Sequence, residues 1–176
     1  DNTTPYSDID LGANLGGSVF QVTGSIGYGM LGWSVAGAGD VNGDFISDIV
    51  VGAPLDINNA ALGPGYAAVL YGYALSASIV DIDLQFLAVG DELGYLIFGA
   101  VDFDQFGYSV SSGGDINGDG INEVIVSAIT NTLDTILNRG SAYVVFGQLY
   151  KATTNLNVTI PSADWFIIKR GIWNTH

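Results

Sequence analysis

Residues 40–48 read D-V-N-G-D-F-I-S-D, and residues 115–123 read D-I-N-G-D-G-I-N-E. Both fit the pattern D-x-N-G-D-x-x-x-[DE], and they lie 75 residues apart in a chain of 176 residues. Each stretch places oxygen-bearing side chains at positions 1, 3, 5 and 9 around a turn that contains glycine. Such a turn can direct its oxygens onto one hard cation, with the backbone carbonyl of position 7 completing the shell.

The pattern therefore predicts two calcium ions, one in each loop. The alternative is an Asx-rich turn that caps two strands without a metal. Each loop gathers three carboxylates within nine residues, and their mutual repulsion in a tight turn favours a bound cation. The predicted ligands are Asp40, Asn42, Asp44, Ile46 and Asp48 in the first loop, and Asp115, Asn117, Asp119, Ile121 and Glu123 in the second.

The residues that follow the loops exclude a helical calcium motif. An EF-hand requires an acidic residue at loop position 12 and a helix on either side, but position 12 is Val51 in one copy and Val126 in the other. The loops instead run into the β-branched stretches D-I-V-V-G-A-P (48–54) and E-V-I-V-S-A-I (123–129). These stretches predict buried strands, so the metal is expected in a β-hairpin.

The same spacing relates further segments of the chain. L-G-W-S-V at 31–35 matches F-G-Y-S-V at 106–110, and G-Y-A-A-V-L-Y-G at 65–72 matches G-S-A-Y-V-V-F-G at 140–147. Repeats of this length indicate a propeller or a linear array. The predicted division is a first repeat at residues 1–81, a second at 82–154, and a partial third at 155–176 that could act as an assembly strand.

The order [FLW]-G-x-S-V, G-x-G-D-x-N-G-D, D-I-V-V-G-A-P and G-x-A-x-V-x-x-G resembles the FG-GAP repeat. That repeat is found in the propeller of integrin α-subunits and in many secreted microbial and protist proteins. The resemblance covers about residues 9–171. It implies an all-β fold with two complete, propeller-blade-like repeats of four antiparallel strands and a partial third, and calcium bound in the hairpin between two strands of each repeat.

The chain departs from the repeat pattern at three places. Phe45 stands where loop position 6 is expected to be glycine, and a bulky residue makes a positive φ costly, so the first site is expected to be the weaker one. Ser127, Ala128 and Ile129 replace Gly-Ala-Pro. The third repeat stops before a calcium loop, and because propellers close with about four to eight blades, this chain is not expected to close a ring alone.

Composition points to an acidic, extracellular or cell-surface protein. Residues 1–138 carry 17 acidic and no basic side chains, whereas residues 139–176 carry four basic side chains and Asp164, which gives −17 and +3 and a net charge of −14. This balance excludes a nucleic-acid footprint. The basic tail either pairs with the acidic body of another copy or is simply solvated. The basic residues are Arg139, Lys151, Lys169 and Arg170.

Several other classes of function find no support in the sequence. The chain has no cysteine and its one histidine is His176, so neither Ser-His nor Cys-His catalysis is expected, and no enzyme is predicted. Its two long uncharged stretches are interrupted by Gly, Asn and Pro, which excludes membrane insertion. A start at Asp1 without methionine suits a processed, secreted product. Sequons at Asn2 and Asn157 leave glycosylation open.

Two functions follow. The first is a secreted, calcium-binding structural or adhesive repeat protein that assembles with other copies into a ring or an extracellular fibre. The second is a non-catalytic propeller fragment of a larger secreted enzyme or cell-surface receptor. The expected partners are other copies of the chain or further propeller blades, and a protein or glycan ligand is left unspecified.

Overall fold

The computed structural model describes residues 20–24, 29–55, 57–58, 61–73, 81–87, 93–130, 140–148, 156–157 and 165–168. These residues form strands and turns, with one short 3-10 helix, η1 (Leu84–Phe86). The all-β prediction is confirmed. Over the same residues, no helix has the length and apolar character needed to cross a bilayer. The sequon at Asn2 and the four basic residues of the tail lie outside the described residues.

The first blade is a four-stranded antiparallel sheet. Its strands, in sheet order, are β2 (Ser34–Gly39), β3 (Asp48–Ala53), β6 (Tyr66–Leu70) and β8 (Gly94–Phe98). A two-residue strand, β12 (Leu156–Asn157), extends this sheet by pairing in parallel with β8. A small hairpin of β4 (Ile57–Asn58) and β5 (Ala61–Leu62) lies between β3 and β6 in the chain.

The second blade repeats this arrangement. Its strands, in sheet order, are β9 (Phe106–Gly114), β10 (Glu123–Ala128), β11 (Ser141–Val145) and β13 (Trp165–Ile168). The prediction of two four-stranded antiparallel repeats is therefore confirmed. The outer strands β8 and β13 lie beyond residues 81 and 154, so each sheet includes a strand that follows the predicted boundary of its repeat.

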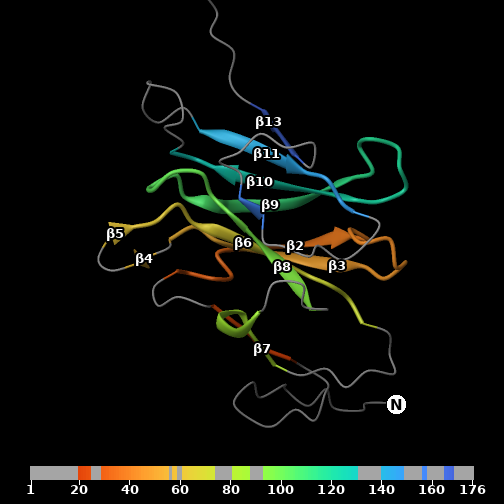
Figure 1. Cartoon of the computed structure of the whole chain (residues 1–176), viewed down its shortest axis with the longest axis horizontal. Helices are drawn as coiled ribbons and strands as arrows, with labels where there is room; N and C mark the ends of the chain where they lie inside the picture. Colours follow the sequence, from red (N-terminus) through yellow and green to blue (C-terminus); the bar gives the residue numbers. More distant parts are fainter. Residues whose placement is uncertain are drawn as a thin grey trace, which may run out of the picture.

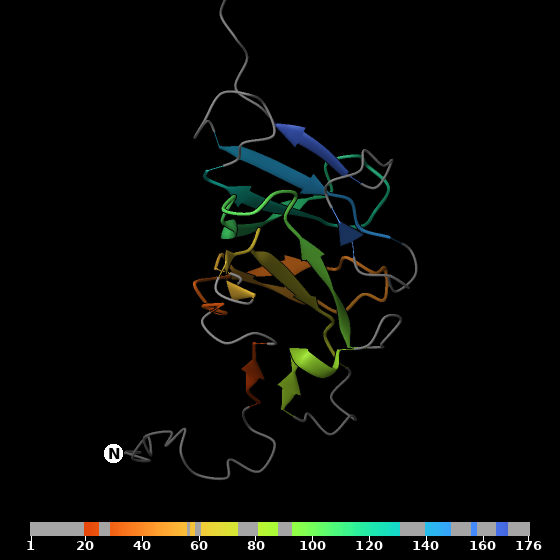
Figure 2. The same ribbon diagram turned by 60° about the vertical axis from the view of Figure 1, so that its left-hand side comes forward.

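Figures 1 and 2 show that the two blades pack face to face, and the larger group of buried side chains lies between them. Side chains alternate between the two faces of a strand, so Val50 and Val69, which are opposite each other in register, point to the same side. They meet Phe106, Val126 and other side chains of the second blade. This buried layer fixes how the two blades, and therefore their loops, lie relative to each other.

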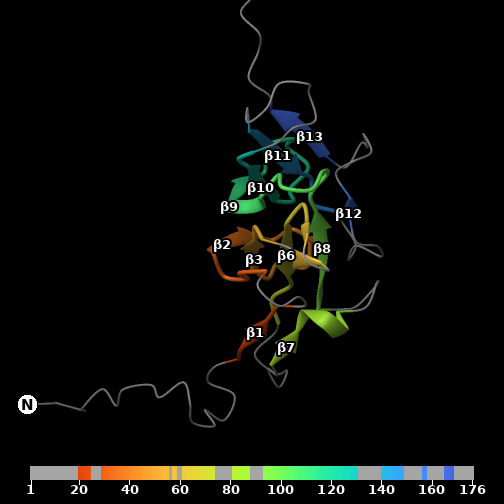
Figure 3. The ribbon, with the colours of Figure 1, turned by 90° about the vertical axis from the view of Figure 1, so that its left-hand side faces the viewer.

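The opposite face of the first blade is covered differently. Its buried side chains include Ala68, Leu70 and Leu96, which pack against Ile82 and Leu84. Ile82 belongs to β7 (Ile82–Asp83), which pairs in parallel with β1 (Val22–Thr23). Figure 3 shows the two short strands on the side of the first blade that faces away from the second. The first blade is thus covered by a full sheet on one face and only in part by short segments on the other.

Glycine allows the backbones of the two blades to approach closely. A Cβ atom added to Gly52 in β3 would lie 2.0 Å from the carbonyl oxygen of Gly107 in β9. That distance is far below van der Waals contact, and backbone atoms in two packed sheets cannot move aside easily. A Cβ atom added to Gly37 in β2, by contrast, would have no atom of the protein within 4 Å beyond its own residue and its two chain neighbours.

We therefore predict that Gly52→Ala destabilises the blade interface and Gly37→Ala does not. Overpacking at Gly52 should lower the unfolding free energy by about 2 kcal/mol, which corresponds to a drop in Tm of roughly 6 °C for a chain of this size. Thermal unfolding followed by circular dichroism measures both variants. Equal Tm values for the two variants would contradict the close approach of β3 and β9.

Candidate metal centre

Each acidic loop joins the first two strands of a blade. Loop 1, residues 40–48, runs from the end of β2 into β3, and loop 2, residues 115–123, runs from β9 into β10. Position 9 of each loop is therefore also the first residue of the second strand. This arrangement agrees with the expected β-hairpin and attaches the predicted ligands directly to the core of each blade.

The carboxylate at position 1 organises the turn. Asp40 Oδ1 accepts hydrogen bonds from the backbone amides of Gly43 and Asp44 at 2.7 and 3.1 Å, and its Oδ2 accepts one from Phe45 at 2.7 Å. In loop 2, Asp115 accepts the three equivalent bonds at 2.7, 3.0 and 2.9 Å. The two loops consequently follow the same backbone path around their first side chain.

Positions 3, 5 and 7 are also equivalent in the two loops. The amide oxygen of Asn42 accepts from the backbone of Asp44 at 3.0 Å, and its Nδ2 donates to Asp44 Oδ2 at 3.0 Å. The Ile46 amide donates to Asp44 Oδ1 at 2.8 Å. Loop 2 repeats these bonds at 3.0, 2.9 and 2.9 Å through Asn117, Asp119 and Ile121. The side chains are held inside the turn, whereas ligation by the two isoleucine carbonyls stays a prediction.

Phe45 adopts the positive φ that the loop requires at position 6. Its φ is 66°, in the left-handed region, and Gly120 in loop 2 has a φ of 89°. The Phe45 side chain is 97% exposed. A non-glycine residue in this region is strained, so loop 1 reaches the shared path at an energetic cost that loop 2 avoids.

The two loops differ most at position 9. Asp48 is 1% exposed, and both of its oxygens accept backbone hydrogen bonds, Oδ2 from Val41 and Oδ1 from Gly72, each at 2.8 Å. Glu123 is fully buried, and its Oε2 accepts a hydrogen bond from the Ile116 amide. Its Oε1 is buried without a hydrogen-bond partner. The longer side chain of loop 2 thus carries a charged oxygen that the protein itself does not satisfy.

Loop 2 also brings its three carboxylates together. One oxygen each from Asp115, Asp119 and Glu123 lie within 4.8 Å of one another. Among the described residues, this is the one group of three potential metal-ligating side chains that converges in this way. In loop 1, by contrast, both oxygens of Asp48 are held by backbone amides, which ties the third carboxylate to the base of its loop.

Burial dominates the electrostatics of the position 9 carboxylate in loop 1. Burial raises the pKa of Asp48, the backbone amides of Gly72 and Val41 oppose that rise, and the negative charges of Asp44 and Asp40 add to it. Burial also raises the pKa of Tyr95, which lies near Tyr71 and Asp48. The charged form of Asp48 is therefore sustained mainly by its two amide donors.

The residues of loop 2 fit a hard divalent cation. Carboxylate and amide oxygens are the donors that calcium prefers, and a buried, unpaired carboxylate oxygen is costly unless a cation or a donor reaches it. Glu123 Oε1 meets that description, and one oxygen of the same carboxylate lies within 4.8 Å of oxygens of Asp115 and Asp119. Loop 1 offers the same donors at positions 1, 3 and 5, but its position 9 is already satisfied.

Gly72, which sequence reasoning did not assign to the site, supports loop 1. Its amide donates to Asp48, and a Cβ atom there would lie 2.4 Å from the Ser47 carbonyl oxygen. The signal was present, because the pattern G-x-A-x-V-x-x-G ends on Gly72 in one repeat and on Gly147 in the other. A repeated glycine after a strand indicates close backbone approach.

The motifs that form these loops and strands match a known repeat family. The FG-GAP repeat matches residues 31–70 and 106–145, which span β2 to β6 and β9 to β11. The chain carries FG-GAP repeats. Both matched segments include a complete acidic loop and the first three strands of a blade, so the family assignment and the observed sheets agree.

Relatives with FG-GAP regions include much longer proteins. Rat phosphatidylinositol-glycan-specific phospholipase D is 32% identical over 143 residues, which cover 81% of this chain and 16% of the relative. Chicken integrin alpha-V is 30% identical over 145 residues, which cover 82% of this chain and 12% of the integrin. Mouse integrin alpha-E is 32% identical over 97 residues, which cover 55% of this chain and 8% of the integrin. The FG-GAP chain thus spans a small part of the length of each relative.

We predict opposite stability effects for Glu123→Gln and Asp48→Asn. Without calcium, Glu123→Gln removes one of three clustered negative charges and should raise Tm by a few degrees, while abolishing any rise in Tm caused by calcium at loop 2. Asp48→Asn leaves one of two backbone amides without an acceptor and should cost about 1–3 kcal/mol with or without calcium.

Thermal melts of both variants in chelator and in calcium test this difference. The result that would contradict the account is a Glu123→Gln protein that is destabilised in chelator and still stabilised by calcium as strongly as the unmodified chain.

Proposed function

We propose that this chain is a non-catalytic, calcium-stabilised segment of a β-propeller that belongs to a larger extracellular or cell-surface protein. The observation that carries the proposal is the Glu123 carboxylate, which leaves its buried Oε1 without a hydrogen-bond partner and has one oxygen within 4.8 Å of oxygens of Asp115 and Asp119. The FG-GAP repeats and the length of the integrin and phospholipase relatives support the larger context.

The proposed calcium role is structural. A calcium ion in loop 2 would offset the repulsion among three carboxylates and join the end of β9 to the buried start of β10. A second ion in loop 1 would bind more weakly, because Asp48 is engaged by two amides and Phe45 holds a strained φ. Calcium at about ten times its dissociation constant adds about 1.4 kcal/mol of stability per ion.

The assignment as a non-catalytic segment is supported by the chemistry of the site. Its described acidic side chains are arranged as ligands around a turn, and a bound cation would keep them ionised. One relative is named as a phospholipase, and the matched region covers 16% of that protein. We therefore assign this chain to the propeller part of such a protein, with its protein or glycan ligand unspecified.

Assembly into rings or fibres, the other function suggested by the sequence, stays a prediction. The proposed assembly strand at residues 155–176 includes β13, which pairs with β11 of the same chain from Val145 opposite Trp165 to Ala142 opposite Ile168. Because β13 fills the outer place of its own sheet, we favour the propeller segment.

Calorimetric titration with calcium tests the proposed function. We expect two binding events for the unmodified chain, loss of the tighter one in Asp119→Ala, and loss of the weaker one in Asp44→Ala. The two aspartates occupy the same loop position and make the same hydrogen bonds, so each variant is the control for the other. Unchanged stoichiometry in both variants would rule out the proposed sites.

A further inference from the structure

The packing of loop 1 on the second blade defines how successive blades recognise each other. The Asp40 amide donates to Asn122 Oδ1 at 3.0 Å, and the Asn122 amide donates to the Asp40 carbonyl at 2.7 Å. The Gln148 amide donates to the Val41 carbonyl at 3.0 Å. Gly147 lies against the same carbonyl, where a Cβ atom would be 2.9 Å away. Loop positions 1 and 2 are therefore fixed to the next blade.

Val41, at loop position 2, is the apolar side chain of this contact. It is 3% exposed and belongs to the core layer that includes Tyr95, Val124 and Val145. Burial of a valine contributes about 1.5–3 kcal/mol. β8 and the second blade thus provide an apolar site for Val41, bordered by the polar backbone contacts of Asn122 and Gln148.

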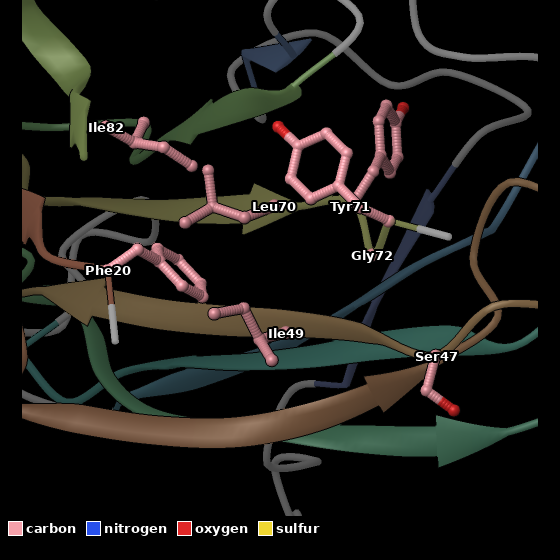
Figure 4. Close-up of a pocket in the computed structure, with 8 residues that line it drawn as sticks. Phe20, Ser47, Ile49, Leu70, Tyr71, Gly72 and Ile82 are labelled. Atoms are coloured by element: carbon pink, nitrogen blue, oxygen red, sulfur yellow. The ribbon is translucent and has the colours of Figure 1, made fainter. Parts of the chain in front are cut away.

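The corresponding site on the first blade is open. The residues that surround loop 1 belong to β8 and to the second blade, and their counterparts 75 residues earlier in the chain are Phe20, Ser47, Ile49, Leu70, Gly72 and Tyr73. All six line one cavity of about 180 Å³. In Figure 4 the side chains of Phe20, Leu70 and Ile82 converge on this space, with Ile49 on the adjacent strand.

Two side chains of this surface are more exposed than their counterparts in the second blade, so within the described residues the surface is not covered as the second blade is. Ile49 is 37% exposed, whereas its counterpart Val124 is 1% exposed beneath the first blade. Val35 is 65% exposed, whereas its counterpart Val110 is 6% exposed. Large apolar side chains on one sheet face are normally covered, and in the second blade they are covered by a preceding blade.

The short strand β1 marks the outer edge of the missing neighbour. β8 pairs in parallel with β12 through Ile97 and Leu156, and β1 pairs in parallel with β7 through Val22 and Ile82. Val22 and Ile97 lie 75 residues apart in the chain, and Ile82 and Leu156 lie 74 residues apart. β8 also pairs with β6 of the first blade, whereas β1 has β7 as its single partner among the described strands. Within the described residues its other edge is unpaired, and this is the edge at which a strand equivalent to β6 would lie.

We propose that the cavity and β1 together dock a further FG-GAP repeat that contributes three inner strands. Its third strand pairs with the free edge of β1, and the apolar side chain at position 2 of its acidic loop enters the cavity. A second copy of this chain does not fit, because β11, the third strand of its second blade, is already flanked by β10 and β13. The proposal rests on the assignment of this chain to a larger propeller.

The test extends the chain with a repeat of its own sequence. A copy of residues 29–75, placed directly before Asp1, keeps the 75-residue period and sets the copied β2, β3 and β6 ahead of β1. The chain has no cysteine, so the single change Ile49→Cys reports burial of the cavity through its rate of thiol labelling. Val124→Cys, in the existing blade interface, reports that the fold is intact, and Ile116→Cys reports a surface that stays open.

We expect the extension to slow labelling at Ile49→Cys by roughly tenfold or more, with Ile116→Cys unchanged and Val124→Cys unreactive throughout. Val41→Asp made only in the copied segment should restore fast labelling, whereas Val41→Ile should preserve protection, since Ile116 is the natural residue at that position of loop 2. Equal labelling rates in the extended and original chains, or an extended chain that unfolds, would overturn the proposal.

These measurements separate the docking proposal from the proposed function. Labelling carried out in chelator and in calcium shows whether protection depends on the loops. Protection in both conditions, with no calcium binding by calorimetry, supports the docking surface and removes the calcium role. Calcium binding without protection supports the calcium role and removes the docking surface.

Discussion

The buried carboxylate at loop position 9 is the constraint on which the rest of this structure depends. A charged oxygen inside a protein must be paired with donors or a cation. In the first blade, Asp48 meets this requirement with the amides of Val41 and Gly72, which lie in the loop and just beyond β6. One side chain thereby fixes the loop, the start of β3 and the end of β6 relative to one another.

In the second blade, the buried carboxylate at loop position 9 is paired differently. Glu123 accepts from one amide of its own loop and leaves Oε1 unpaired, and one oxygen of this carboxylate lies close to two other carboxylates. One additional methylene group therefore separates a loop satisfied by backbone donors from a loop that fits a cation. The repeat pattern treats Asp and Glu at this position as equivalent, but the structure gives them different chemistry.

Much of the fold could be predicted from the sequence, because the evidence was periodic. The 75-residue spacing predicted two repeats, the β-branched runs predicted a buried strand after each loop, and the resemblance to the FG-GAP repeat implied four antiparallel strands in each repeat; both sheets were found. The outer strands could not be assigned in the same way, since β8 and β13 lie beyond the repeat boundaries and join the preceding sheet through long-range pairing. Sequence spacing also could not show that Val41 is buried by the next blade while Ile116 is 50% exposed.

The predicted ligand positions were brought together only in part by the structure. Positions 1, 3 and 5 form the same hydrogen bonds in both loops because those contacts are local. Position 9 depends on tertiary contacts, including the Gly72 amide 24 residues away in the chain, and the nine-residue loop pattern does not encode them. The difference between the loops therefore arises from the side chain at position 9 together with its packing.

Anomalous scattering from a crystal of the chain grown with calcium tests the central claim most directly. The account predicts a calcium peak in loop 2 at about 2.3–2.6 Å from Glu123 Oε1, with Asp115 and Asp119 in the same coordination shell. A crystal with saturating calcium and no peak at this oxygen, or with a peak in loop 1 alone, would contradict it.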